Sequence, residues 1–170
     1  MAPRYGYEDN VMSRPRPSNF GILDEENKFK AQSLNLLVGP LLGEGAFRRV
    51  YELRYTTDLV LKIDYGASLM NVAEWLTWTE LQHSEWAKWL APCQAIDEFT
   101  GALVQKRCRP LTEEEWDALK EIPAFLGDAT RISNWGWYQE GDQPGRPVMV
   151  DYAINNLAGR GLARMKMVKR

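Results

Sequence analysis

A glycine-punctuated stretch around residue 43 constrains the fold more than any other feature of the chain. It reads LNLLVGPLLGEG over 34–45, and RRVYELRY over 48–55 then alternates as a half-buried strand does. DLVLKID, at 58–64, supplies a third short strand. Two strands around a glycine turn, followed by another strand, predict an antiparallel meander.

Helical periodicity follows the third strand. It begins at Asn71, the expected N-cap, and runs to Leu90, where Ala91-Pro92 stops it. Four tryptophans share one face that is roughly 80° wide at about 100° per residue, and we expect this face to pack on the core; they are Trp75, Trp78, Trp86 and Trp89. That orientation places Glu74, expected in the first turn, beside the sheet and Glu80 in water.

The rest of the chain indicates short strands and one short helix. CQAIDEFTGALVQKRC, at 93–108, predicts two strands joined by a turn at Thr100-Gly101. TEEEWDALK, from Thr112, begins with a capping box completed by Glu115. A loop follows over 125–137, and RPVMVDYA is a strand that ends in an acid. The fold class is therefore α+β.

Composition excludes several kinds of site. Two cysteines and one histidine rule out a cysteine-only zinc cage and a three-histidine zinc site. The 21 basic and 23 acidic residues give a net charge of −2, which by itself indicates no partner. No apolar run approaches 18 residues, so we expect a cytoplasmic protein without membrane contact.

We divide the 170 residues into three parts. Residues 1–33 form an arm rich in Pro, Arg, Asn and Tyr, residues 34–156 form the folded domain, and residues 157–170 form a basic tail. The tail carries five Lys or Arg and no acid. Only this tail offers phosphate contacts to a nucleic acid, so we do not expect nucleic acid as the main partner.

The meander and the helix together place a set of residues suited to phosphate binding. Gly43 and Gly45 let the backbone close over a phosphate without Cβ clashes. Lys62, on the next strand, reaches the same phosphates. An acid on the following helix holds that lysine as an ion pair, and Glu74 is our choice over Glu80.

In these residues the sequence resembles the protein-kinase superfamily. The matching pieces are Glu74 and four motifs: LGEGAFRRVY at 42–51, VLK at 60–62, NWG at 134–136 and VMVDYA at 148–153. Their compressed layout is similar to small kinase-like proteins of tailed bacteriophages, which implies the host cytoplasm. The resemblance implies a kinase-like small lobe, an antiparallel sheet plus one long helix, with a minimal remnant of the large lobe.

The resemblance also implies roles for individual residues. Gly43 and Gly45 cover the phosphates of ATP, Lys62 holds them and Glu74 orients Lys62. Asp151 binds magnesium, and Asn134 supplies a second metal oxygen. Asp128 is the candidate catalytic base.

Three departures from the family pattern leave two functions open. Arg48 stands in place of the third glycine of the loop, and Asp128 precedes Asn134 by six positions where active kinases have five. Only 19 residues follow Asp151, so we expect no activation segment and no peptide-docking groove. The chain is then either an ATP- and magnesium-dependent phosphotransferase with an unknown acceptor, or a degenerate kinase-like protein that binds a host or virion protein.

Overall fold

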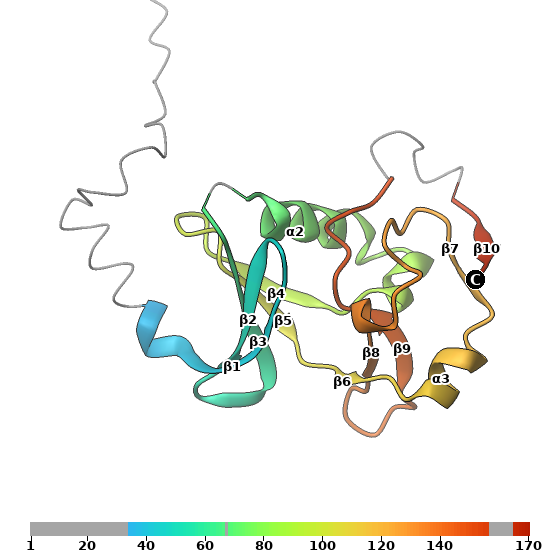
Figure 1. Ribbon diagram of the computed structural model, residues 1–170, viewed down its shortest axis with the longest axis horizontal. Helices are drawn as coiled ribbons and strands as arrows, with labels where there is room; N and C mark the ends of the chain where they lie inside the picture. Colours follow the sequence, from blue (N-terminus) through green and yellow to red (C-terminus); the bar gives the residue numbers. More distant parts are fainter. Residues whose placement is uncertain (1–33, 67, 157–164) are drawn as a thin grey trace, which may run out of the picture.

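The structure, a computed structural model, describes residues 34–66, 68–156 and 165–170 (Figure 1). The predicted arm, 1–33, and residues 157–164 of the predicted tail lie outside the described residues. An antiparallel five-stranded sheet has the order β1-β2-β3-β5-β4. Its strands are β1 (Val38–Glu44), β2 (Arg48–Leu53), β3 (Thr56–Asp64), β4 (Cys93–Ile96) and β5 (Leu103–Lys106). The predicted meander and the predicted β4–β5 hairpin are both present, so the α+β class is confirmed.

One α-helix, α2 (Met70–Leu81), packs against β3, β4 and β5. It ends at Leu81, nine residues before the predicted end at Leu90. Ser84 explains the early end: its hydroxyl donates to Leu81 O and accepts from the Trp86 backbone N–H, so it caps a new helix instead of continuing the old one. That new helix is the 3-10 helix η1 (Glu85–Trp89).

The buried face of α2 differs from the predicted one. It carries Asn71, Glu74, Thr77 and Leu81. The four tryptophans, two on α2 and two on η1, are partly buried and pack against the core. The N-cap is Leu69, so the prediction of Asn71 as N-cap is wrong. Asn71 instead turns its amide inward, where Nδ2 donates to the carbonyls of Lys62 and Gly101 at 2.8 and 2.9 Å.

The C-terminal part, from Arg109 onward, forms smaller sheets beside the first (Figure 1). Its elements are β6 (Arg109–Pro110), α3 (Glu113–Ala118), β7 (Glu121–Pro123), η2 (Ile132–Asn134), β8 (Trp135–Tyr138), β9 (Arg146–Met149) and β10 (Met167–Lys169). Strands pair in the order β6-β8-β9, and β7 pairs with β10. The predicted capping box of α3 is present, with Thr112 and Glu115 bonded reciprocally.

The last described residues, 165–170, pack against the fold. Val168 and Met165 contact the core, and the Arg170 guanidinium lies over the Trp116 ring, 3.9 Å from its centroid. Arg170 also pairs with Asp117 at 3.4 Å. Part of the predicted basic tail is therefore a sheet strand.

A hydrophobic core joins the two parts of the chain. Trp86 meets Phe125 edge-to-face with ring centroids 5.8 Å apart, and Trp89 meets Trp135 in the same way at 6.3 Å. These contacts hold η1 of the first part against the second. Among the described residues, no helix combines the length and the apolar character needed to cross a membrane.

Candidate functional site

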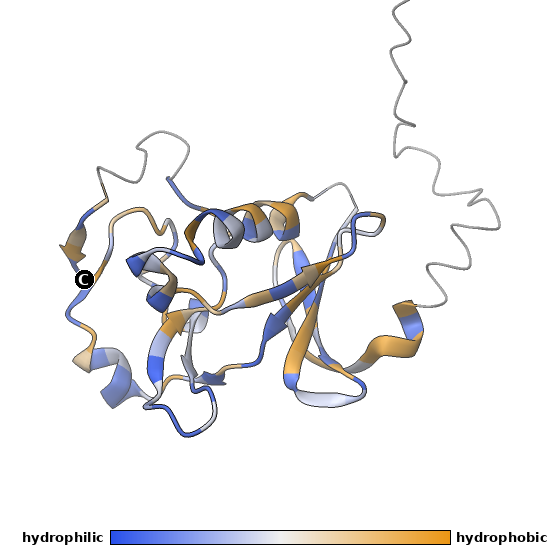
Figure 2. Ribbon diagram, turned by 180° about the vertical axis from the view of Figure 1, so that it is seen from behind, coloured by the Kyte–Doolittle hydropathy of each residue, from blue (hydrophilic) through white to orange (hydrophobic). Residues whose placement is uncertain are grey.

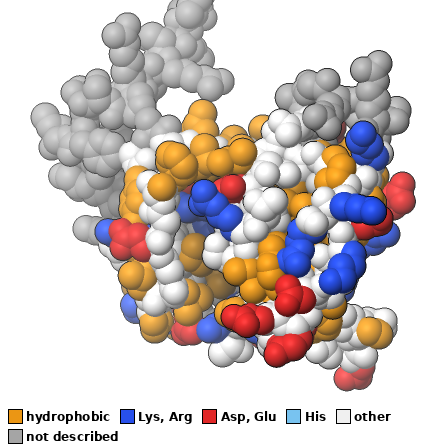
Figure 3. Space-filling model, turned by 45° about the vertical axis from the view of Figure 1, so that its right-hand side comes forward, with side chains coloured by type: hydrophobic (Ala, Val, Ile, Leu, Met, Phe, Trp, Pro, Cys, Tyr) orange, Lys and Arg blue, Asp and Glu red, His pale blue; other side chains and the backbone are white. Residues whose placement is uncertain are grey.

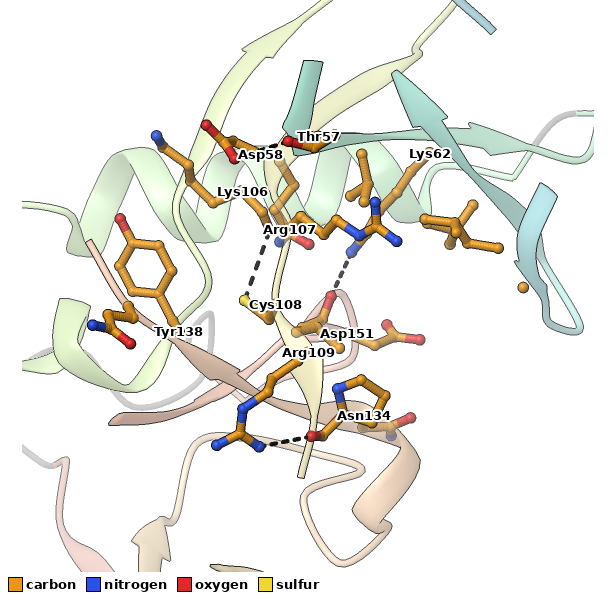
Figure 4. A pocket seen from close by; sticks show the side chains of 18 of the residues that line it. Thr57, Asp58, Lys62, Lys106, Arg107, Cys108, Arg109, Asn134, Tyr138 and Asp151 are labelled. Atoms are coloured by element: carbon orange, nitrogen blue, oxygen red, sulfur yellow. Dashed lines mark hydrogen bonds between the residues drawn. The ribbon is translucent and has the colours of Figure 1, made fainter. Parts of the chain in front are cut away.

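A cleft of about 790 Å³ lies between the five-stranded sheet and the β6-β8-β9 sheet (Figure 4). Four of the residues predicted for the site line it: Gly43, Lys62, Asn134 and Asp151. Gly45, Glu74 and Asp128 do not line it. On the face shown in Figure 3, basic and acidic side chains gather beside a hollowed region.

Lys62 and Glu74 form a buried ion pair. Lys62 lies on β3, the central strand, and its Nζ is 2.5 Å from Glu74 Oε1. The side chains are 4% and 0% exposed. Lys62 Nζ also donates to Val150 O, and Gln105 Nε2 donates to the same Glu74 oxygen at 2.7 Å. The predicted pairing of Lys62 with Glu74 is present, and Glu80 is exposed as expected.

Arg48, which the sequence analysis placed in the loop as the replacement of a glycine without assigning it a role, is the central residue of the site. It begins β2 directly after the glycine turn, and its side chain is 6% exposed. Its guanidinium donates to Asn71 Oδ1 at 3.1 Å and to Asp151 Oδ1 at 2.5 Å. It also donates to Glu74 Oε2. One cation therefore bridges the helix acid and the acid predicted to bind magnesium.

The two buried cations differ in how firmly they hold their protons. Burial lowers the pKa of Arg48, but the charges of Glu74 and Asp151 outweigh it and raise the pKa above its ordinary value. Burial also lowers the pKa of Lys62, and there the attraction of Glu74 only partly compensates. Arg48 is thus a permanent charge, whereas Lys62 is the more readily deprotonated of the pair.

Asp64 adds a third acid near Arg48. Its Oδ2 accepts from the Asn71 backbone N–H at 3.0 Å, and its Oδ1 is buried with no hydrogen-bond partner within the described part of the chain. Burial raises the pKa of Asp64, which the Asn71 N–H and Arg48 oppose. The neighbourhood of Arg48 is therefore richer in carboxylates than the sequence motifs indicate.

The two glycines of the turn are not required by local geometry. Gly43 pairs with Val50, and a Cβ added to Gly43 would meet nothing within 4 Å. A Cβ on Gly45 would meet only Arg48 O, at 3.7 Å. Neither glycine has a positive φ. The space above Gly43 is open to the cleft, as close approach of a ligand to the backbone requires.

Asp128 lies outside the cleft. Its side chain is 39% exposed, and its carboxylate is 3.5 Å from Arg131 Nε. Its contact with the site runs through the backbone, since Asn134 Nδ2 donates to Asp128 O at 2.9 Å. That bond fixes the amide of Asn134 and leaves its side-chain oxygen as the group available to a ligand.

The donor set fits a nucleotide better than it fits a protein-held magnesium ion. Apolar Leu42, Val50 and Val60 line the wall on which a base could pack. For magnesium, Asp151 offers one carboxylate, already bonded to Arg48, and Asn134 offers one amide oxygen. No group of three or more His, Cys, Asp or Glu suited to a metal occurs among the described residues. Magnesium is commonly held by one or two protein oxygens together with nucleotide phosphates and water, so these two residues would suit the ion only if Asp151 gave up its bond to Arg48.

Basic side chains also lie where β5 leads into β6. Lys106, Arg107 and Arg109 line the cleft there. Arg107 pairs with Glu52 at 2.8 Å, and Arg109 pairs with Glu115 at 2.5 Å. These acids offset much of the positive charge, so the strongest buried charges of the cleft are those around Arg48.

Comparison of the chain with protein-family models, with curated protein sequences and with solved structures found no match.

Proposed function

We propose that this chain is a kinase-like protein that binds ATP in the cleft and has little or no phosphoryl-transfer activity. The buried Lys62–Glu74 pair at the cleft carries the proposal. An ion pair buried this completely costs desolvation free energy, and such groups cluster at functional sites. A lysine on the third strand, held by an acid of the next helix, is the arrangement that positions nucleotide phosphates in protein kinases.

Two features favour binding over catalysis. The candidate base, Asp128, does not line the cleft and is paired with Arg131. General base catalysis needs the base within hydrogen-bond reach of the acceptor hydroxyl, and misplacement by about an ångström already costs about a hundredfold in rate. Asp151 is bonded to Arg48. The catalytic constellation is therefore incomplete.

A protein-binding role is consistent with the exposed edge of the sheet. Hydrophobic residues run along β1 and residues 34–37 at this edge (Figure 2). Leu36 is 60% exposed and Leu41 is 51% exposed. Exposed edges and apolar patches are sites at which partners bind. We propose a host or virion protein as the class of partner, in line with the phage-type layout of the motifs.

Calorimetric titration with ATP tests the proposal. The wild type should bind, and Lys62→Ala should weaken binding by roughly tenfold or more, because a charged hydrogen bond to phosphate contributes about 1.5–3 kcal/mol. Lys88→Ala is the matched control, since Lys88 is exposed on η1 and outside the cleft. Thermal unfolding of each variant verifies that it is folded. No heat with the wild type would refute nucleotide binding.

The second candidate is an active phosphotransferase. It is favoured by Asn134 and Asp151, which line the same cleft as Lys62. Incubation with radiolabelled ATP distinguishes the two candidates. Transfer of label to the chain or to water that disappears in Asp128→Asn would establish the enzyme; our proposal expects no transfer in either protein.

A further inference from the structure

We propose that Arg48 takes the place of a divalent cation in this cleft, so that the phosphates of a nucleotide bind without magnesium. The inference rests on the nucleotide binding proposed above, and it specifies how the site balances charge. It begins from the position of the guanidinium, which contacts both Glu74 and Asp151.

The charge balance at the site depends on Arg48. With it, two cations, Arg48 and Lys62, pair directly with two anions, Glu74 and Asp151, and a third carboxyl group, Asp64, lies near Arg48. With glycine at position 48, as in the family pattern, one cation would face these acids, and a phosphate would need a metal ion to offset the excess negative charge. The guanidinium supplies a positive charge at the same carboxylate, Asp151, to which the metal would bind.

Arg48 also has N–H groups left to donate to the oxygens of a phosphate. Asn71, Glu74 and Asp151 occupy one hydrogen of Nη1 and both of Nη2. Among the described residues, Nε–H and the second Nη1 hydrogen have no acceptor, and Arg48 lines the cleft. The planar fork of arginine matches phosphate oxygens, and its charge persists at all ordinary pH values. Fixed donors of this kind bind a phosphate without a loss of side-chain freedom on binding.

A magnesium ion would have to compete with this arrangement. Binding to Asp151 would remove one of the partners of a buried guanidinium and place a double positive charge beside it. Both effects are unfavourable because the guanidinium is buried, although the Asp151 side chain itself is 49% exposed. The cleft offers one other oxygen ligand, from Asn134, so phosphate and water would have to complete the shell around the ion.

Titration of the wild-type chain with ATP, in magnesium and separately in EDTA, tests the inference. We expect the affinity in EDTA to lie within fivefold of that in magnesium. A loss of fivefold or more in EDTA would overturn the inference while leaving nucleotide binding intact. Absence of binding in both buffers would refute the proposed function and this inference with it. Magnesium alone should neither release heat nor raise the melting temperature; a measured rise would count against the inference.

Variants at neighbouring positions assign the effect to Arg48. Arg48→Gln should make binding magnesium-dependent, with an affinity ratio above fivefold between the two buffers, while Arg48→Lys should keep the ratio near that of the wild type. Arg49→Gln is the matched control, because Arg49 is exposed and pairs with Glu44 at 3.0 Å on the outside of the turn. An unchanged ratio in Arg48→Gln would show that Arg48 does not replace the ion. If that variant does not fold, the two-buffer titration of the wild type decides.

Discussion

The two sides of the cleft, which we call its two walls, differ in the kind of side chain that they bury. On the sheet side, β2, β3, β5 and α2 contribute a cluster of buried polar side chains; it consists of Arg48, Lys62, Asn71, Glu74 and Gln105. On the opposite side the buried side chains are mainly aromatic and apolar, and they include Phe125, Trp135, Tyr138, Met149 and Tyr152, of which Tyr138 lines the cleft. The sheet side therefore holds most of the buried charges, and the other side holds most of the buried aromatic groups.

This difference indicates that the buried charges serve ligand binding and that the aromatic groups serve stability. Buried ion pairs contribute little net stability, because desolvation offsets their attraction, and their retention indicates a role other than stability. The aromatic wall contributes apolar burial, which is the main source of folding free energy. Asp128, which the sequence predicted to act as a base, belongs to the second wall, and its side chain is partly exposed. We infer that the buried charges of the sheet side recognise the ligand together with Asn134 and Asp151, and that the aromatic core of the second side holds the first in place.

Removal of the shared acid should have the largest effect. Glu74→Gln leaves two buried cations, Lys62 and Arg48, with a neutral partner. Breaking a buried pair from one side destabilises a protein by about 3–5 kcal/mol. Urea denaturation measures the change. Glu80→Gln, at an exposed position of the same helix, is the control and should stay within about 0.5 kcal/mol of the wild type. Equal stabilities of the two variants would contradict the network described above.

An intermediate effect is expected from a methyl group added to each wall. A Cβ at Gly136, on β8, would lie 2.6 Å from Cys108 Cβ and 3.1 Å from Arg109 O, whereas one at Gly43 would meet nothing within 4 Å. We expect Gly136→Ala to cost about 1–3 kcal/mol by overpacking. Gly43→Ala should change stability by less than about 0.5 kcal/mol. Gly43→Ala should instead lower the affinity for ATP, measured by calorimetry, if phosphates approach the backbone at this position.

The opposite result for the two glycine variants would contradict this comparison of the two walls. A large loss of stability in Gly43→Ala, with Gly136→Ala unaffected, would mean that the turn is structural and that β8 has room to spare.

The local parts of this fold could be predicted from the sequence, and the long-range parts could not. The meander, the β4–β5 turn at Gly101 and the Thr112 capping box depend on neighbouring residues. The end of α2 was missed because the hydroxyl of Ser84 outweighed the helical period of the tryptophans. Their period correctly indicated packing on the core, but it misidentified which face is fully buried.

The candidate site shows the same limit. The pairing of Lys62 with Glu74 spans 12 positions and could be inferred from a strand followed by a helix. Arg48 reaches partners that are 23, 26 and 103 positions away, and no local pattern reports such contacts. The order of motifs also did not indicate that Asp128 would lie outside the cleft, where it pairs with Arg131.

The smallest effect is expected from alkaline pH, at a thiol that lies between the walls. Cys93, on β4 of the sheet, contacts Tyr152 Oη of the other part through its sulfur at 3.0 Å. Burial raises its pKa to about 12 from 9.0. Above pH 9 the unfolded chain therefore loses this proton while the folded chain keeps it, so stability should fall as pH rises from 9 towards 12.

Cys93→Ala should make that decline shallower by at most about 1.4 kcal/mol per pH unit, because one proton is involved. Lys62 acts in the opposite direction, since its lowered pKa leaves the unfolded chain with more bound proton just below 10.5. Lys62 is present in both proteins, so the difference between their slopes isolates the thiol. Urea denaturation at several pH values from 8.5 to 10.5 measures both slopes. Identical slopes would mean that the Cys93 thiol is solvated in the folded chain, and that the two walls do not close over it.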